Sequence, residues 1–452
     1  MIVDNALVRY YEEIRAALRD LLGDPEKAGS EGFTPGVELP ELTAAMQEYL
    51  SVSGLAHAAM PSYRGRSLAL LDLTRNPATM TTKTFASLVI VARAVRFIQD
   101  TGQRVTIVTP SSANKAIAMR DAVLRAIRTG LVDADRLNVV TVVPEGAVGK
   151  LRSSELFTDP GLRARNPIAV YGGAEPGTVK AIALGFVGEH RNAVEKECET
   201  NLWYTLQLEN YLAADVVRAL AEAELFPSAP GEARLHLHSV SSAYGLLGHA
   251  YGRSRLSADV RSRTLPPHYF LVQHLGAPDM VLSLYNEGST DTGNLPEYGY
   301  DAETGLFTQS ADPRYPARTF DPRETLDPTF YTRNPPTSPR MNELIRTQGG
   351  GGIVVSLAEC LGRYGQVRAL LGEAGVRLPA NPTALREWSL VMAMTGLLNA
   401  VDRGLVPETD ILVHGSGSYS ATDYGHLTVR DLHPVTTAED LRRVVLDATP
   451  SA

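Results

Sequence analysis

At 452 residues, the chain is longer than one ordinary hydrophobic core supports, so we expect two lobes. Its hydrophobic content of 44% and charged content of 21% are typical of a soluble globular enzyme, and with a net charge of −8 no basic block stands out to neutralise nucleic-acid phosphates. No apolar run reaches membrane-spanning length, and two cysteines without CxxC spacing argue against a zinc site or disulfide framework and favour a reducing cytoplasm.

The N-terminal residues show an amphipathic helical pattern. Five large apolar residues recur at three- to four-residue spacing, namely Leu7, Tyr11, Ile14, Leu18 and Leu22. Acidic residues interrupt them, and Gly23 and Pro25 end the pattern. We therefore expect a helix here and not a signal peptide.

From residue 84 to about residue 190, helical and strand patterns alternate. A broad apolar face predicts a helix from Thr84 that Gly102 closes. Further strands are expected at residues 105–108, 137–143 and 167–170, and further helices at residues 113–127 and 178–187. Strands separated by such helices imply βαβ units and a parallel sheet, whose loops after each strand share one edge where ligands bind.

The alternation resumes after a loop near residue 200. We expect helices at residues 210–224, 245–255, 357–373 and 383–403, and strands at residues 234–238, 269–272 and 411–413. Residues 275–342 are rich in Pro, Tyr, Arg, Asp and Asn without periodicity, and we interpret them as a long ordered insertion. The run Gly349–Gly352 lacks the Lys-Ser/Thr of a P-loop, and we interpret it as a flexible link.

The most informative stretch runs from Asn76 to Lys83, where a hydroxyl-rich turn ends at a lysine and an apolar helix follows. A lysine so placed, if partly desolvated, can lose its proton near neutral pH and form a Schiff base with an aldehyde. A lysine at a helix start is more often simply solvated, so its meaning depends on what the other loops offer.

Three further loops follow strands at the expected ligand edge. Residues 111–115 (Ser-Ser-Ala-Asn-Lys) and 239–245 (Ser-Val-Ser-Ser-Ala-Tyr-Gly) each lead into a helix, where free N–H groups and hydroxyls bind anions or merely cap the helix. Residues 414–417 (His-Gly-Ser-Gly) would let a ring lie against the backbone, or form a tight turn. His236 and His238 alternate on a strand, which favours one sheet face over a metal site.

In this order, the loops resemble those of the pyridoxal-phosphate enzymes of fold type II, the tryptophan synthase β type, with threonine synthases among them. The resemblance covers roughly residues 70–420, apart from the insertion. It implies an α/β protein with two three-layer α/β/α lobes and mostly parallel sheets. The large cofactor-binding lobe would comprise residues 1–83 and 200–452, the small substrate-side lobe residues 84–199, and the family's habit is a homodimer.

The resemblance also implies roles for the loops, with pyridoxal 5′-phosphate held as a Schiff base by Lys83, which then serves as the base at the α-carbon. Asn114 would contact the phenolic oxygen of the cofactor. The substrate carboxylate would be held by Ser111, Ser112 and Lys115. The phosphate would be held by Ser241, Ser242, Ala243, Tyr244 and Gly245. Either Ser416 or His414 would face the pyridine nitrogen, and a hydroxyl there suits β- or γ-elimination or replacement on an amino acid.

The chain departs from the family pattern in four places. One extra residue separates Asn-Pro from Lys83, serines replace glycines in the phosphate loop, Lys115 adds a cation where a threonine is usual, and the insertion has no counterpart. These departures suggest that substrate and reaction have drifted from primary metabolism, and the Ala- and Arg-rich composition together with the insertion suggests a bacterial specialised-metabolite pathway. They also leave open a carrier-bound substrate under a large lid, or a non-catalytic scaffold that kept the fold without the chemistry.

The insertion and the N-terminal helix are the expected lid elements. The insertion carries four arginines that would either grip an anionic substrate group or pair with acidic neighbours, namely Arg314, Arg318, Arg323 and Arg333.

Overall fold

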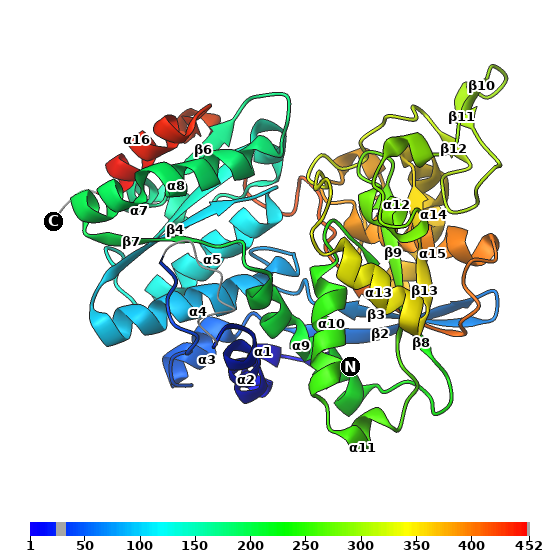
Figure 1. Cartoon of the computed structure of the whole chain (residues 1–452), viewed down its shortest axis with the longest axis horizontal. Coiled ribbons are helices and arrows are strands. Elements are labelled where there is room, and N and C mark those ends of the chain that lie inside the picture. The colour runs from blue at the N-terminus through cyan, green and yellow to red at the C-terminus, as the bar shows by residue number, and fades with distance from the viewer. Residues whose placement is uncertain (24–32, 450–452) are drawn as a thin grey trace. The chain divides into compact units, whose positions relative to one another are not determined.

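A computed structural model describes residues 1–23 and 33–449 (Figure 1). The chain divides into two compact units. Unit 1 comprises residues 1–3, 55–75 and 216–421, and unit 2 comprises residues 4–54, 76–215 and 422–452. Each unit has one main sheet with helices packed on both faces, so the expected architecture of two three-layer α/β/α lobes is confirmed.

The unit boundaries differ from the lobes expected from the sequence. Residues 76–83 and 200–215 belong to unit 2, together with residues 4–54 and 422–452. The segment near residue 200 was expected to be a loop, but it forms strand β7 (Thr200–Tyr204), which pairs in parallel with β4 (Arg104–Pro110). Backbone hydrogen bonding to β4 therefore places this segment in unit 2.

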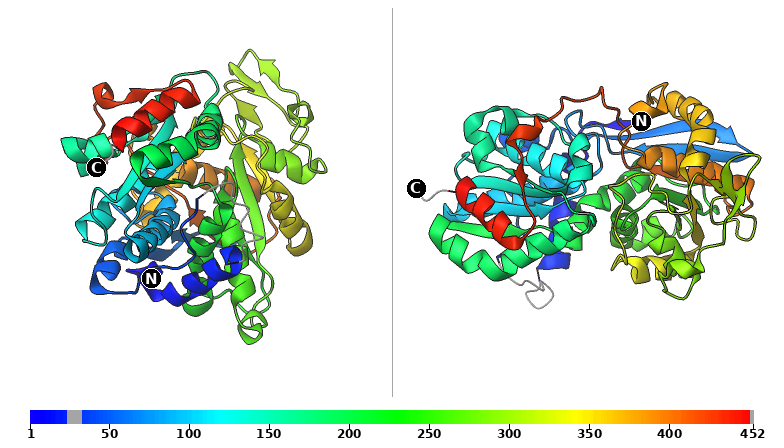
Figure 2. Two further views of the ribbon diagram at one scale, coloured as in Figure 1. Left: turned by 60° about the vertical axis from the view of Figure 1, so that its left-hand side comes forward. Right: turned by 90° about the horizontal axis from the view of Figure 1, so that it is seen from above.

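Unit 2 is built on a five-stranded parallel sheet in the order β15-β6-β5-β4-β7. Its other strands are β5 (Leu137–Pro144), β6 (Ile168–Tyr171) and β15 (His433–Pro434). Helices α4 (Lys83–Thr101) and α5 (Asn114–Arg128) pack together on one face, and α8 (Thr178–Cys198) packs on the other with α16 (Ala438–Ala448) beside it (Figures 1 and 2). The helix and strand pattern expected for residues 84–190 is confirmed, with α8 longer than expected.

Shorter elements complete unit 2. They are α1 (Ala6–Arg9), α2 (Tyr11–Leu22), α3 (Ala44–Leu50), the 3-10 helix η1 (Glu145–Lys150), α6 (Glu155–Thr158), α7 (Pro160–Arg165) and the 3-10 helix η4 (Val429–Asp431). The amphipathic N-terminal pattern is confirmed by α1 and α2, whose apolar residues are buried. The expected stop at Gly23 is observed, whereas Pro25 lies outside the described residues.

Unit 1 is built on a seven-stranded sheet in the order β1-β2-β3-β14-β8-β9-β13. The antiparallel edge consists of β1 (Ile2–Val3), β2 (Leu55–Tyr63) and β3 (Arg66–Asp72). The parallel part consists of β14 (Asp410–Gly415), β8 (Arg234–Ser239), β9 (His268–His274) and β13 (Gly350–Val355). Alternate residues of these strands form a core with α14 (Leu357–Glu373) and α15 (Ser389–Asp402).

The remaining helices of unit 1 connect or cover these strands. They are the second half of α9 (Leu208–Leu225), α10 (Tyr244–Arg255), α11 (Ala258–Arg261), α12 (Asp279–Tyr285), α13 (Ser338–Gln348) and the 3-10 helix η3 (Pro382–Ala384). Helices α12 and α13 contact β9 and β13. No helix among the described residues is long and apolar enough to cross a membrane.

The interpretation of the glycine run as a flexible link is wrong, because Gly350–Gly352 open strand β13. This strand pairs in parallel with β9 over its whole length. A Cβ atom on Gly350 would lie 1.9 Å from the carbonyl oxygen of Tyr269, and one on Gly352 would lie 3.1 Å from Val281 of α12. Glycine is therefore needed for close packing here, and it does not indicate flexibility.

The segment expected as an irregular insertion contains more regular structure than the sequence indicated. Helix α12 lies within it, helix α13 closes it, and between them are the 3-10 helix η2 (Thr292–Asn294) and a small antiparallel sheet of β10 (Gly299–Asp301), β11 (Leu306–Thr308) and β12 (Arg318–Thr319). The expectation that this segment is ordered is confirmed.

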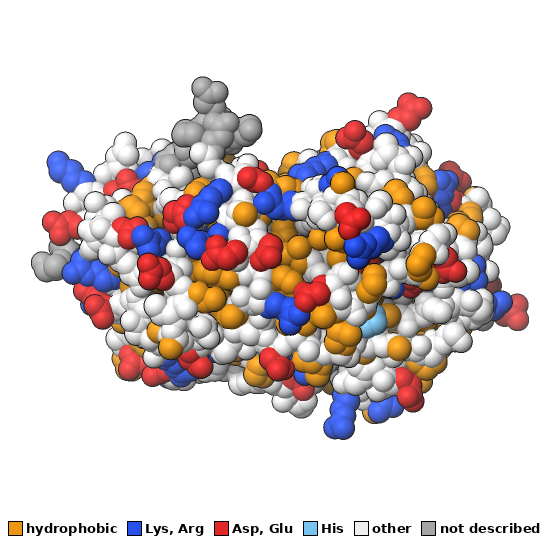
Figure 3. Space-filling model, turned by 90° about the horizontal axis from the view of Figure 1, so that it is seen from below, with side chains coloured by type: hydrophobic (Ala, Val, Ile, Leu, Met, Phe, Trp, Pro, Cys, Tyr) orange, Lys and Arg blue, Asp and Glu red, His pale blue; other side chains and the backbone are white. Residues whose placement is uncertain are grey.

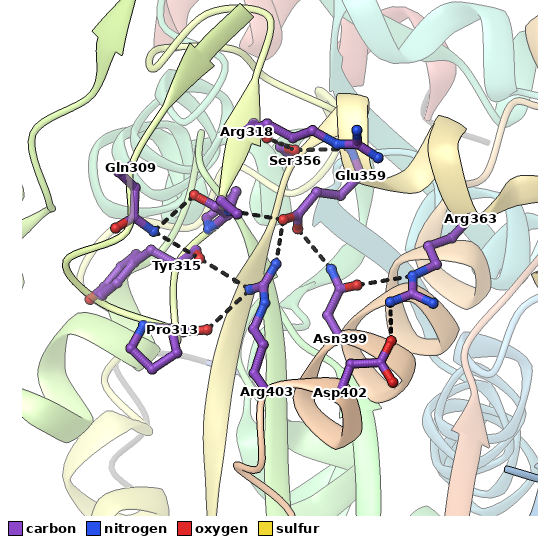
Figure 4. A network of polar contacts seen from close by, with 12 residues as sticks. Gln309, Pro313, Tyr315, Arg318, Ser356, Glu359, Arg363, Asn399, Asp402 and Arg403 are labelled. Carbon is purple, nitrogen blue, oxygen red and sulfur yellow. Dashed lines mark hydrogen bonds and ion pairs between the residues drawn. The ribbon is translucent and has the colours of Figure 1, made fainter. Parts of the chain in front are cut away.

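A buried carboxylate fastens the insertion to the helices of unit 1 (Figure 4). Glu359 of α14 accepts hydrogen bonds from the backbone N–H of Ala317 at 2.9 Å and from Asn399 at 2.8 Å, and it pairs with Arg403. Arg403 in turn donates to the carbonyl oxygen of Tyr315 at 3.1 Å. The insertion thus joins α14 and α15 through a desolvated ion pair, the kind of contact that is costly to break.

The insertion arginines mostly have acidic neighbours. Three of the four pair with a carboxylate: Arg314 with Asp312, Arg323 with Asp321, and Arg333 with Asp279. Arg318 is exposed. On the face drawn in Figure 3, basic and acidic side chains are likewise interspersed, without a broad patch of one sign. The pairing alternative therefore has more support than a substrate grip.

Candidate functional site

The turn before Lys83 is fixed by side chains from its own unit. Asn76 is buried, its Oδ1 accepts from the N–H of Ala78 at 3.0 Å, and its Nδ2 donates to Asp121 of α5 at 2.8 Å. The carbonyl oxygen of Ala78 accepts from Arg152 at 3.0 Å. The Asn-Pro sequence thus folds as an asparagine-closed turn tied to α5.

This geometry predicts that Asn76→Ala destabilises unit 2. Burial raises the pKa of the Asp121 carboxyl, and the hydrogen bond from Asn76 opposes that rise. Removing the donor takes from the half-buried carboxyl of Asp121 its hydrogen bond to Asn76, at an expected cost of about 1–3 kcal/mol in the free energy of unfolding. Urea unfolding measures this, with Asn192→Ala, an exposed asparagine, as the control. Equal stability of the two variants would contradict the assignment.

Lys83 is the first residue of helix α4, as expected. Its backbone N–H donates to the hydroxyl of Thr81 at 3.3 Å, and the buried hydroxyls of Thr79 and Thr84 lie 2.5 Å apart within the same turn. The side chain of Lys83 is partly exposed, and its Nζ lies 5.4 Å from the ring centroid of Tyr211 in α9. Threonine hydroxyls therefore hold the backbone under the lysine, and the aromatic ring of Tyr211 lies within cation–π distance of its amine.

Lys115, expected to add a cation beside the substrate carboxylate, points away from solvent. It is buried, and its Nζ donates to the carbonyl oxygen of Thr205, just after β7. Burial lowers the pKa of this amine well below its usual value, and the charges of Lys83 and Lys180 lower it further. A buried amine with a lowered pKa, bound to a carbonyl oxygen, is a weaker counter-ion for a carboxylate than a solvated ammonium. The expectation of an added cation at this position is therefore not supported.

The loop before α5 divides into a capping part and an accessible part. The buried hydroxyl of Ser111 accepts from the N–H groups of Ala113 at 3.1 Å and Ala116 at 2.9 Å, which is the capping alternative. Ser112 and Asn114 are partly exposed. Of the candidates in this loop, these two keep side chains accessible to a ligand.

In unit 1, the expected phosphate loop joins β8 to α10. Ala243 has φ +51°, a left-handed conformation that turns the chain into the helix. The insertion contacts this loop, since Ser241 donates to Thr332 at 2.8 Å and the carbonyl oxygen of Ser242 accepts from Thr337 at 2.8 Å. The serines thus bind the insertion as well as shaping the loop, which places the proposed lid segment directly on it.

The turn after β14 distinguishes Ser416 from His414. His414 is fully buried, and its two ring nitrogens lie 3.0 Å from Arg218 and 3.0 Å from His236. Ser416 is partly exposed, and its Oγ lies 3.0 Å from that of Ser239 at the end of the neighbouring strand β8. Of these two candidates, Ser416 is the one accessible to a ring nitrogen.

The structure therefore groups the candidates by unit. Lys83, Asn114 and Lys115 belong to unit 2, and the loop 239–245 and Ser416 belong to unit 1 at the carboxyl ends of two adjacent strands. The sequence reasoning missed Arg218 and Glu222, which are buried on α9. Their signal was a charged pair four residues apart within an apolar helix.

Comparison with known proteins assigns the chain to a family. Residues 2–449 match the profile of a family described as a family of unknown function, DUF6002. The chain belongs to this family. No curated protein sequence matches it.

Solved structures add the fold. The chain is similar to threonine synthase from yeast, with a TM-score of 0.51 and 10% identity over 99% of this chain and 82% of that one. It is also similar to pyridoxal-phosphate-bound threonine synthase from Brucella melitensis, with a TM-score of 0.50 and 12% identity over 90% of this chain and 78% of that one. This DUF6002 member thus has the fold of the fold type II pyridoxal-phosphate enzymes, as the loop order indicated.

Proposed function

We propose that this DUF6002 member is a pyridoxal-phosphate enzyme that acts on an amino acid by β- or γ-elimination or replacement. The observation that carries the proposal is Lys83. In a chain with the fold type II fold, a lysine begins α4 directly after a buried Asn-Pro turn. The two neighbours named above are threonine synthases, and one of them holds the cofactor.

Each unit offers groups that suit the cofactor. The amine of Lys83 can bind its aldehyde, Ser416 offers a hydroxyl for the ring nitrogen, and the N-terminus of α10 offers N–H groups and a positive dipole for the phosphate. When bound, the cofactor supplies an electron sink for the α-carbon of the amino acid. The amine of Lys83 removes the α-proton, and Ser112 and Asn114 orient the substrate carboxylate and the cofactor ring.

The proposal is tested by trapping the cofactor on the protein. Protein incubated with pyridoxal phosphate, reduced with borohydride and digested should yield one modified peptide, carrying the added mass on Lys83. Modification spread over exposed lysines, with none at Lys83, would contradict the proposal.

The class of reaction is tested by deuterium exchange. We expect at least one amino acid with a leaving group at its β- or γ-carbon to exchange its α-proton with D₂O, because Lys83 acts at that carbon. Attachment at Lys83 without exchange for any amino acid tried would instead support a scaffold that binds the cofactor without catalysing a reaction.

A further inference from the structure

Six polar side chains form a continuous buried chain on the sheet face of unit 1 that α9 and α10 cover. Arg218 Nη1 lies 3.0 Å from His414 Nδ1, and His414 Nε2 lies 3.0 Å from His236 Nδ1. His236 Nε2 lies 3.5 Å from Oε1 of Glu222. On the other side of this carboxylate, His249 Nε2 lies 2.7 Å from Oε2, and His249 Nδ1 lies 3.0 Å from the hydroxyl of Tyr269.

The order of donors along this chain is fixed at one end. A guanidinium has only donors, so Nδ1 of His414 must accept from Arg218. Nε2 of His414 then carries the proton and donates to Nδ1 of His236. Nε2 of His236 must in turn carry a proton, which points to Glu222. Arg218 thus determines the tautomers of His414 and His236, and every hydrogen bond from Arg218 onward donates in the direction of Glu222.

Glu222 is an ionised acceptor at the end of the chain. Burial alone would raise the pKa of its carboxyl, but His236, the hydrogen bond from His249 and the charge of Arg234 lower it below its usual value. Arg234 donates to Glu222 at 2.9 Å and to Asp410 at 2.9 Å. Burial lowers the pKa of both His236 and His414 well below the usual value, so both rings are neutral near pH 7.

The same tautomers disfavour a metal ion at this cluster. Glu222, His236 and His249 have the composition of a two-histidine, one-carboxylate site, with ligand atoms within 4.8 Å of one another. A metal ligand needs a free lone pair, however, and Nε2 of His236 carries a proton in the order that Arg218 imposes. The cluster is therefore a hydrogen-bonded support, whose first member is a buried cation.

That cation lies directly under the loop 239–245. A Cβ atom on Gly245, in the first turn of α10, would lie 3.2 Å from Nη2 and 3.3 Å from Cζ of Arg218, and 3.2 Å from Nε2 of His238. Only a glycine lets the guanidinium approach the helix this closely without displacement. Arg218 is 1% exposed, so water screens its charge weakly at the N-terminus of α10.

We propose that Arg218, held in place by the His414–His236–Glu222 chain, is a positioning residue that makes the loop 239–245 selective for a phosphate monoester. The proposal rests on the proposed function, since it concerns the phosphate of that cofactor. The buried guanidinium adds positive charge at the N-terminus of α10, which this loop enters. His414, His236 and Glu222 act through Arg218 by fixing where its charge lies.

The first test compares pyridoxal phosphate with pyridoxal, the same aldehyde without the phosphate. In Arg218→Gln the dissociation constant for pyridoxal phosphate should rise about tenfold or more, and that for pyridoxal less than about twofold. Arg93→Gln is the matched control, because Arg93 is 2% exposed, lies in unit 2 and should leave the preference unchanged. An unchanged preference in Arg218→Gln would overturn the proposal.

Inorganic phosphate separates this inference from the proposed function. Phosphate should raise the melting temperature of the wild type and of Lys83→Ala, but not that of Arg218→Gln. If trapping finds no cofactor on Lys83 while this dependence on Arg218 persists, the proposed function fails and the anion-selective loop remains. If phosphate protects Arg218→Gln as well as the wild type, the inference fails, whatever Lys83 does.

The tautomers can be measured without any variant. Protein with ¹⁵N-labelled histidine should show neutral rings protonated at Nε2 for both His414 and His236. This remains decisive if Arg218→Gln does not fold. Nδ1-protonated rings, or one equivalent of a divalent metal that is lost in His249→Gln, would overturn the inferred order.

Discussion

Lys83→Ala is expected to abolish covalent cofactor attachment and to lower turnover by about three orders of magnitude or more. Two functions are lost at once, because the same amine holds the aldehyde and removes the α-proton. The fold should survive, since the side chain of Lys83 is partly exposed and the turn beneath it is held by Thr79, Thr81 and Thr84. Trapping by borohydride, followed by a kinetic assay on an exchanging amino acid, measures both losses.

Lys196→Ala is the control for this experiment, because Lys196 is an exposed lysine near the end of helix α8. It should keep wild-type attachment and turnover. Lys83→Arg keeps the charge but cannot form the bond to the aldehyde, so it should behave like the alanine variant. Undiminished turnover in Lys83→Ala would refute the assigned role. The amine of Lys115 would then be the next lysine to test for cofactor attachment.

The second large effect is a loss of stability between pH 6.5 and about 5. Burial lowers the pKa of His274 to about 4 and those of His236 and His414 well below the usual value. Unfolded histidines have a pKa of about 6.5, so below that pH the unfolded chain binds protons that the folded chain does not. Stability should therefore fall as the pH falls, by about 1.4 kcal/mol per pH unit for each such histidine.

Together, these three histidines should give a slope that approaches about 4 kcal/mol per pH unit once the unfolded rings are protonated, and His57, whose pKa burial also lowers, adds to it. Urea unfolding at pH 7, 6 and 5 measures it. His274→Asn should reduce the slope by about a quarter to a third, whereas His433→Asn, at an exposed site, should not change it. A flat profile would mean that these rings are charged in the folded state.

Helices and strands with strong local patterns could be predicted from the sequence. Helix α14 has the expected bounds, and Lys83 begins α4 as expected, because apolar spacing and glycine caps are local signals. Strands β2 and β3 were not predicted. Strand β13 was taken for a link, since its glycines have no local strand signal and are needed only because Tyr269 and Val281 approach them.

The candidate loops could likewise be found in order, but not their detailed roles. Sequence could not separate Ser416 from His414, because burial decides between them and burial depends on which strands lie on either side of β14. Nor could it show that Lys115 turns to the carbonyl oxygen of Thr205, ninety residues away. These contacts join segments distant in sequence, so no local spacing encodes them.

By itself, the sequence determined the fold class and the position of one lysine, since periodicity and turn chemistry act over a few residues. The tertiary structure alone decided which polar groups are desolvated and which donors meet which acceptors. Arg218, Glu222 and three histidines become one directed chain only when β14, β8 and β9 align beneath α9 and α10. The free energy of a buried charge depends on such neighbouring groups, which strand pairing and helix packing bring together.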